Sequence, residues 1–310
     1  MTTATDRPGR RSEDPLVRQT KKATQLLVAS ARHSYDPRVD VNWDEPLEEG
    51  KWFLPEKRIS LYGTELYDSL SMEQKLLLSR EELASSLAAG VWTEHILLHL
   101  VSRYAYKRDI TSPQVQFALT EVADEVRHMI MFAQLVEKTG SEFYPVNPKT
   151  QRAGLLLKTF APVPALWAML LLTEEFFDRF QREQASDETV QPLVRTVARI
   201  HVVEEARHIS FARTELERFV PTLSKRRLQM LRDFLASVVK SIRRDRYNPL
   251  MYERAGLDPK VCVEAGRNNP VGLVNGAYGA ERIAPYYKSI GLIGGRSEKV
   301  WRSAGWLKDA

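Results

Sequence analysis

The sequence has little that would stabilise it covalently and no segment suited to a membrane. Its one cysteine, Cys262, cannot form an internal disulfide, which is typical of a reducing cytoplasm. The most apolar run, residues 153–173, is interrupted by Lys158, Pro162 and Pro164, so we expect a buried helix and no membrane span.

Other signatures are also missing. No stretch alternates between apolar and polar residues as a half-buried strand would, and no G-x-G-x-x-G fingerprint of a dinucleotide site is present. The formal net charge is only +5. Its densest basic clusters, residues 225–227 and 243–246, accompany no nucleic-acid-binding motif, so we interpret them as solvated helix faces and expect no nucleic-acid partner.

Helical periodicity dominates from Ser71 onward. Ser71 stands three residues before Gln74, the arrangement of a capping box, and apolar residues then recur at helical spacing to about Tyr106. We predict further helices over about 113–139, 164–184, 187–220 and 224–245. Pro145 and Pro148 mark a loop between the helix that ends near 139 and the helix that begins near 164. Short helices and loops should follow.

Organisation along the chain follows from the same pattern. We expect a flexible or docked, irregular N-terminal arm over 1–60, including a mobile tail over the first 22 residues. A helical domain should cover 61–245, and 246–310 should cover the bundle as part of the same domain. The predicted class is all-α: a four-helix bundle with extra C-terminal helices.

Two copies of one short motif lie 80 residues apart. The first ends in Glu125-Val-Arg-His128, and the second ends in Glu205-Ala-Arg-His208. With only six histidines in the chain, chance alone would not be expected to give two Glu-x-x-His motifs at matched positions.

The same offset relates two further glutamates, Glu94 and Glu174, each 31 residues before the glutamate of its motif. Glu-x-x-His places both side chains on one helical face. Four carboxylates in apolar helices would be costly to bury without cations. Four Glu and two His converging from four helices match the ligands of a carboxylate-bridged two-metal site, and carboxylates with imidazoles suit iron or manganese.

One further histidine breaks the repeat. His201 stands one turn before Glu205, where the first copy has Glu121. It could reach the metal held by Glu174, Glu205 and His208, or it could be a satisfied core histidine. His95 and His99 point away from Glu94, and we expect both to pack or lie at the surface.

Two acids immediately precede the motif glutamates. We hypothesise that Asp124 orients His208 and that Glu204 orients His128, crosswise between helices, because ligating imidazoles usually donate their other N–H to a carboxylate. The alternative is a solvated acid paired with Arg127 or Arg207.

These motifs resemble the 4-aminobenzoate N-oxygenase family over about residues 70–220, with the third histidine as the distinguishing feature. The resemblance implies a ferritin-like, usually dimeric di-iron enzyme that activates O2 and oxidises an aromatic amine with electrons from an external donor. It also implies that Glu125 and Glu205 bridge the ions, that Glu94 and His128 complete one site, and that Glu174, His201 and His208 complete the other. Glu125, Glu205 and His201 would be the catalytic residues.

The substrate is less well defined by the sequence. Carbon hydroxylation, or iron binding and oxidation as in ferritins, are the alternatives to N-oxygenation. A carboxylate on the substrate would need a cation, for which Arg267 and Arg282 are candidates. Aromatic residues could line a pocket or belong to the core: Trp92, Tyr104, Trp167, Phe176 and Phe177.

Overall fold

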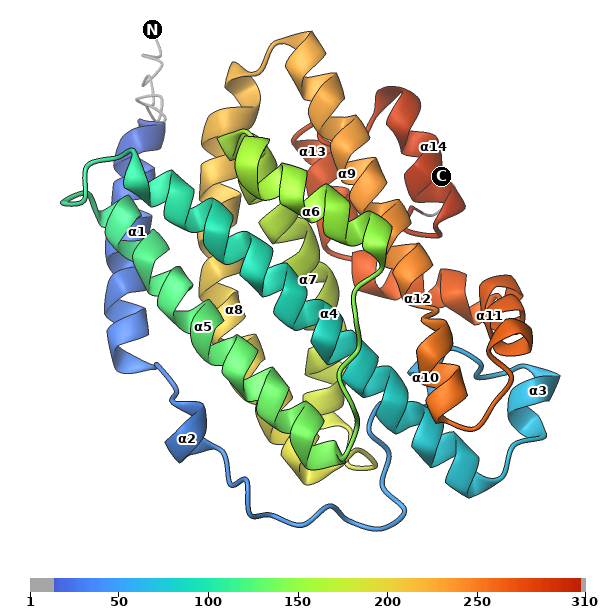
Figure 1. Ribbon diagram of the computed structural model, residues 1–310. Coiled ribbons are helices and arrows are strands. Elements are labelled where there is room, and N and C mark those ends of the chain that lie inside the picture. Colours follow the sequence, from blue (N-terminus) through green and yellow to red (C-terminus); the bar gives the residue numbers. More distant parts are fainter. Residues whose placement is uncertain (1–13, 308–310) are drawn as a thin grey trace, which may run out of the picture.

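The computed structural model describes residues 14–307 and confirms the all-α class (Figure 1). No strand occurs within that range, where the only β-type pairing is a single bridge between Trp52 and Val190. No helix within 14–307 is long and apolar enough to cross a membrane.

Four long helices form the bundle, and they pair in the order of the chain. They are α4 (Met72–Tyr106), α5 (Pro113–Thr139), α7 (Val163–Ser186) and α8 (Pro192–Phe219). Helix α4 packs mainly on α5, and α7 packs mainly on α8, so the two pairs face each other across the core. The chain therefore brings the two halves of the 80-residue repeat together.

The ends of these helices have the predicted caps. Ser71 and Gln74 form the reciprocal capping box of α4, which satisfies two backbone N–H groups that the helix leaves free. Helix α5 ends at Gly140, whose φ of 74° is a left-handed conformation that favours glycine. Helix α8 begins later than predicted, at Pro192, because the Asp187 side chain accepts from the Thr189 backbone N–H and holds a turn.

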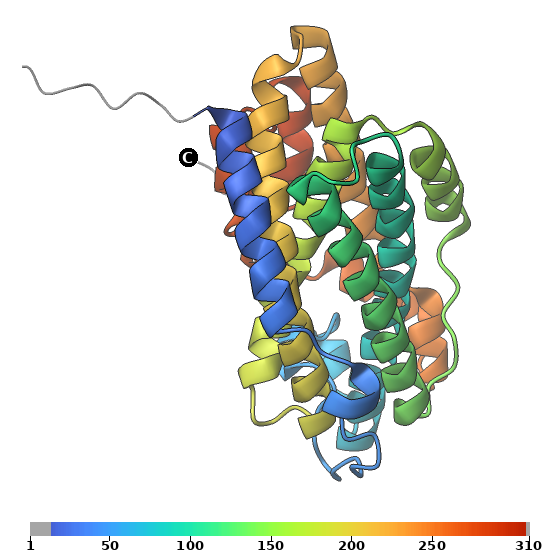
Figure 2. The ribbon, with the colours of Figure 1, turned by 90° about the vertical axis from the view of Figure 1, so that its left-hand side faces the viewer.

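The N-terminal arm differs from the prediction, because part of it is helical. Helix α1 (Pro15–Arg32) lies along α5 and α8, as Figure 2 shows. Asp14 caps it, and its buried residues fall on one stripe at helical spacing: Gln19, Ala23, Leu26 and Ser30. Two of these four residues are polar, which is why the sequence shows only a weak hydrophobic periodicity here. Of the predicted mobile tail, residues 1–13 lie outside the described range.

The rest of the arm is irregular apart from two short elements, α2 (Pro37–Asp40) and η1 (Glu56–Arg58). Helix α3 (Glu65–Asp68) follows the arm.

A second difference is α6 (Pro148–Phe160), where we predicted a loop. Asn147 caps it and Pro148 suits its first turn, but only Gly154 is buried, packed against Trp92 of α4. A helix with so little apolar contact leaves almost no periodic pattern in its sequence.

The C-terminal region has the predicted short helices. Helix α9 (Lys225–Asp245) is followed by α10 (Pro249–Arg254), α11 (Pro259–Asn268), α12 (Val271–Ala280), α13 (Ile283–Ser289) and α14 (Glu298–Ser303), with turns η2 (Val220–Thr222) and η3 (Gly295–Ser297). Helices α9, α12 and α13 pack on α7, so this region covers one side of the bundle. The domain boundaries at 60 and 245 stay predictions.

Helix α12 packs closely on α7 because Gly279 has no side chain. A Cβ added to Gly279 would lie 2.7 Å from Cδ2 of Phe176, whose ring stacks on Trp306 at 4.0 Å. We expect Gly279→Ala to lower the free energy of unfolding by about 1–3 kcal/mol, the usual range for overpacking. Urea unfolding followed by circular dichroism measures this change.

Gly90→Ala in α4 is the matched control, because a Cβ at this position would lie 3.6 Å from the Phe132 ring, an ordinary van der Waals distance. The free energy of unfolding of that variant should rise by about 0.5–1 kcal/mol, since alanine is more favourable than glycine in a helix interior. Equal effects from both substitutions would contradict the packing argument.

Candidate metal centre

The structure brings the six repeated glutamates and histidines together inside the bundle. Each is almost fully buried, and each core helix contributes at least one of them: Glu94 from α4, Glu125 and His128 from α5, Glu174 from α7, and Glu205 and His208 from α8. Three sets have ligand atoms within 4.8 Å of one another: Glu125 with Glu205 and His208, His128 with His201 and Glu205, and Glu94 with Glu174 and His201.

Two of the carboxylates lie between both imidazoles. His128 Nδ1 is 3.1 Å from both Glu125 and Glu205. His208 Nδ1 is 3.2 Å from Glu125 and 3.1 Å from Glu205. Each of these two glutamates therefore points one oxygen at each histidine, which is the position that a bridging carboxylate needs.

The outer nitrogen of each imidazole bonds to an acid on the opposite helix. His128 Nε2 donates to Glu204 at 2.9 Å, and His208 Nε2 donates to Asp124 at 3.2 Å. The predicted crosswise hydrogen bonds are thus present. They fix each ring with Nδ1 facing the carboxylates, the orientation that leaves Nδ1 available to a metal.

The alternative pairing with arginine is present as well. Arg207 Nη2 lies 3.3 Å from both Asp124 and Glu204, and Arg127 donates to Asp124. The two acids are only 1% exposed, so they are not the solvated pair that the alternative required. Arginine balances their charge while each also accepts from a histidine.

His201 lies beside His128, with ring centroids 4.5 Å apart. We predicted it in the group of Glu174, Glu205 and His208, and its Nε2 lies 3.4 Å from Glu205. Because α5 and α8 run antiparallel, as the pairs Asp124–His208 and Glu204–His128 require, a residue one turn before Glu205 faces the His128 end of α5. Its Nε2 is also within reach of both Glu94 and Glu174, so it sits between the two α4 and α7 carboxylates.

Two residues near the centre had no predicted role. Gln181, seven residues after Glu174 and so on the same face of α7, accepts from His201 Nδ1 at 2.6 Å. This bond leaves His201 Nε2 as the free nitrogen. The spacing from Glu174 was the only signal for Gln181 in the sequence.

Glu121 is the other. It is fully buried, and neither of its oxygens has a hydrogen-bond partner in the described chain. It occupies the position in α5 that His201 occupies in α8, so the repeat itself was the available signal. Burial raises the pKa of its carboxyl well above the ordinary value.

The polar atoms of the centre fit a pair of divalent cations. Glu94 Oε2, His201 Nε2 and Glu205 Oε1 are buried without a hydrogen-bond partner in residues 14–307. Buried polar groups nearly always have partners, and a ligated metal is one of the few alternatives. Cations bound at the centre would give such atoms partners.

The carboxyl groups divide into two classes. Burial, followed by the charges of Glu125 and Glu205, raises the pKa values of Glu94 and Glu174 well above the ordinary value. Burial opposes ionisation of Glu205 too, but His208, His201 and His128 hold its pKa well below the ordinary value. The pKa of Glu125 is likewise lowered by His128 and His208 despite burial.

The histidines complete this balance. Burial disfavours their charge, but the surrounding carboxylates raise the pKa values of His128 and His208 well above the ordinary value. Burial lowers the pKa of His201 to about 4. Without metal, these shifts favour charged His128 and His208 beside ionised Glu125 and Glu205, the protonated forms of Glu94 and Glu174, and a neutral His201.

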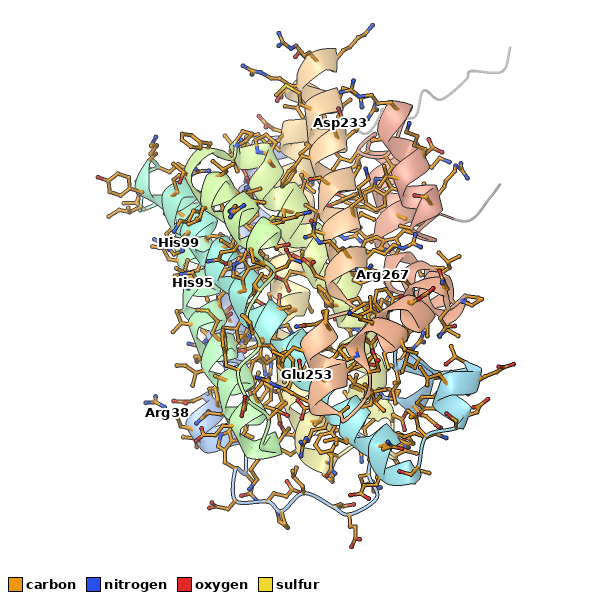
Figure 3. All side chains as sticks on the ribbon, turned by 45° about the vertical axis from the view of Figure 1, so that its right-hand side comes forward. Arg38, His95, His99, Asp233, Glu253 and Arg267 are labelled. Carbon is orange, nitrogen blue, oxygen red and sulfur yellow. The ribbon has the colours of Figure 1, made fainter. Side chains whose placement is uncertain are left out.

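Other residues considered from the sequence lie away from this cluster. His95 is exposed on the outer side of α4, one turn from half-buried His99, as expected (Figure 3). Arg282 is exposed 3.8 Å from Asp178, and Arg267 is exposed on α11. Neither contacts a residue of the metal cluster.

The five aromatic residues divide between core and surface. Tyr104 and Trp167 pack edge-to-face at 5.1 Å in the core, and Phe176 stacks on Trp306. Trp92 is half-buried and donates to Gln151, and Phe177 is 38% exposed. All five therefore have packing or surface roles in this structure.

The chain is similar to known proteins in sequence and in fold. The sequence model of one family, described as p-aminobenzoate N-oxygenase AurF, matches residues 18–291. Uncharacterised proteins of Mycobacterium bovis and Mycobacterium tuberculosis are 28% identical over 209 residues, which is 64% of this chain and 61% of theirs. The matched region thus spans less than two thirds of these relatives.

Solved structures give weaker likenesses. Two mutants of R2-like ligand-binding oxidase, reconstituted with a Mn/Fe cofactor, align with TM-scores of 0.41 and 0.39 at 14% and 15% identity. They cover 92% and 83% of this chain, and 99% and 95% of their own. At these scores, neither likeness supports a statement about metal or substrate.

The protonation pattern predicts a measurable release of protons. Binding of two divalent ions should expel one proton each from Glu94, Glu174, His128 and His208, or about four per chain at pH 7. The apparent affinity should therefore rise with pH. Isothermal titration calorimetry in buffers of different ionisation enthalpy counts these protons.

Exposed His95 offers the control, because His95→Gln should leave the number unchanged. Release of about one proton or none would show that the centre is already deprotonated and would contradict the pattern above.

The crosswise acids make a second prediction. Asp124→Asn and Glu204→Gln keep the size of each side chain but remove the charge that the histidine faces. Each should weaken metal affinity by about 10- to 100-fold, the usual effect of such partners. Competition with a chromogenic chelator measures the affinity.

Glu215→Gln is the matched control, since Glu215 is equally buried on α8 but pairs with Arg218. An equal loss in that variant would mean that any buried charge change on α8 disturbs binding.

Proposed function

We propose the function of this chain from one premise: it belongs to the p-aminobenzoate N-oxygenase AurF family. The chain is a non-haem di-iron oxygenase that uses O2 to oxidise the nitrogen of a small aromatic amine. The observation that supports this best is the pair of carboxylates, Glu125 and Glu205, each placed between two imidazoles in a buried four-helix site.

Seven residues would hold the two iron ions. Glu125 and Glu205 would bridge them, Glu94 and His128 would complete one site, and Glu174 and His208 would complete the other. His201 is the seventh ligand, and its short distance to His128 favours the His128 ion. Carboxylate oxygens with a few imidazole nitrogens suit iron, with manganese as the closest substitute.

When bound, the two ions supply the reduction of O2 that N-oxygenation needs. In the first step one oxygen atom enters the new N–O bond and converts the amine into a hydroxylamine. The other oxygen atom leaves as water, and an external donor supplies two electrons with two protons. Repetition of this chemistry would lead through the nitroso to the nitro compound.

The residues around the ligands have separate tasks. Glu204 and Asp124 hold the rings of His128 and His208 so that Nδ1 faces inward. Gln181 fixes the tautomer of His201. The neutral His201 ring can bind metal without first losing a proton. Phe132 lies 4.8 Å from His201 and covers that side of the centre from water.

The assembly and the location are also proposals. We propose a cytoplasmic homodimer that receives electrons from a separate reductase or small carrier. Sedimentation equilibrium would test the dimer, and a monomer at micromolar concentration would refute it.

One experiment tests metal, oxygen chemistry and substrate together. The iron-loaded protein is reduced, mixed with ¹⁸O2 and a panel of arylamines including 4-aminobenzoate, and quenched after one turnover. We expect ¹⁸O in an N-oxygenated product of at least one arylamine, detected by mass spectrometry, because the centre lies in a family of N-oxygenases.

His95→Gln, changed at the surface of α4, is the control and should react normally. Label in a carbon-bound hydroxyl would instead indicate a hydroxylase. Repeated turnover of added iron into a mineral, with no labelled organic product, would indicate iron oxidation and storage.

A further inference from the structure

A second feature of the molecule lies outside the bundle, where α9, α11 and α14 meet. These helices border a cavity of about 310 Å³ that opens to the surface, where Lys240, Arg243 and Arg267 are exposed. It is lined by Lys240, Arg243, Arg244, Tyr247, Arg267, Val300, Ser303 and Ala304. Figure 3 shows Arg267 on the C-terminal side of the molecule, away from α4 and α5.

Most of the charge comes from one face of α9. Lys240, Arg243 and Arg244 are spaced at i, i+3 and i+4, so their side chains leave the helix on the same side, and Tyr247 follows just after the helix ends. Arg267 reaches the cavity from α11. Four cations thus converge on one small space from two helices.

Little in the described chain neutralises them. Arg244 bonds to Asp245 at 2.7 and 3.0 Å, and Arg243 donates to the Ser303 carbonyl. Lys240 and Arg267 have no ion pair or side-chain hydrogen bond with any residue in 14–307. One carboxylate therefore faces four cations.

Helix-end electrostatics explain only part of this arrangement. Arginines in the last turn stabilise a helix dipole, and Arg243, Arg244 and Arg267 each occupy such a position. The dipole does not require that two helices direct these side chains into one cavity, where like charges repel. It also does not account for Lys240, which stands before the last turn.

One lining residue of the cavity is aromatic and buried. Tyr247 is buried to 6% exposure, and its hydroxyl has no hydrogen bond with residues 14–307. Its ring fits closely against two glycines, because a Cβ on Gly266 would lie 2.9 Å from Tyr247 Cδ1 and one on Gly272 would lie 2.6 Å from the hydroxyl. The ring is thus held in place beside the cations.

We propose that this cavity binds a small molecule through a phosphate or pyrophosphate group. A doubly or triply charged anion would compensate the charge that Asp245 leaves unbalanced, which a single carboxylate would not. Guanidinium groups match phosphate oxygens in paired hydrogen bonds. The volume is at the low end for small-ligand sites. Its cations line one pocket of the surface, unlike the extended basic stripe that contacts nucleic acid.

Binding is tested on the metal-loaded, full-length protein by isothermal titration calorimetry at low ionic strength. The probes are inorganic phosphate, pyrophosphate and phenyl phosphate, with benzoate as the carboxylate comparison. We expect saturable one-to-one binding of at least one phosphate compound, tighter than benzoate by about 10-fold or more. Comparison of phosphate with phenyl phosphate shows whether the organic group contributes.

Arg267→Gln should weaken the binding by about 10-fold, the loss of one charge-assisted contact, and Arg267→Lys should restore part of it. Arg226→Gln removes the same charge from the exposed start of α9, outside the cavity, and should change the affinity less than twofold. Circular dichroism checks that each variant is folded.

Three outcomes would overturn the proposal. They are equal losses in Arg267→Gln and Arg226→Gln, benzoate binding that is as tight as that of the phosphates and is weakened by Arg267→Gln, and no saturable binding of any probe up to 10 mM. Tight binding of a short oligonucleotide that depends on both arginines would instead identify a nucleic-acid surface. Because the readout is binding, the result does not depend on whether the metal centre oxidises arylamines.

Discussion

Burial of four carboxylates in one helical core is the constraint on which the rest of the molecule depends. Glu94, Glu125, Glu174 and Glu205 would repel one another strongly if all were ionised without cations. In the metal-free protein the histidines and two retained protons resolve this conflict. Two divalent ions would resolve it without protons, so the same charge arrangement that stabilises the apoprotein also prepares the ligands for metal.

Antiparallel packing of α5 on α8 converts a repeat in sequence into a shared site. Each Glu-x-x-His motif supplies an inward pair, and the acid just before its glutamate supports the histidine of the opposite helix. Neither helix completes a site alone, because the bridging glutamates and the orienting acids serve both halves. Arg207 joins the two acids and keeps this outer layer of the centre close to neutral.

Sequence reasoning found the bundle and the six clustered residues because both leave a periodic trace. Long amphipathic helices repeat at 3.6 residues, and the ligands repeat at 80. It missed α1 and α6, whose contacts involve few apolar residues. It grouped His201 with Glu174 and Glu205, which lie within reach of its Nε2, but not with His128, because helix direction and not spacing decides which end of α5 that residue faces. It missed Gln181, because a single amide that hydrogen-bonds to one histidine leaves no recurring motif in the sequence.

The two halves of the 80-residue repeat differ at two positions near the centre. His201 replaces the glutamate found at 121, and Gln181 stands where the first half has Val101, which cannot accept a hydrogen bond. One half therefore has a neutral, oriented nitrogen, whereas the other has a buried carboxyl group with no partner in the described chain. Imidazole binds metal in its neutral form, but a carboxyl group must first lose its proton. The two halves of the site are consequently unequal in ligand and in charge, so two ions bound there would differ in how they hold oxygen.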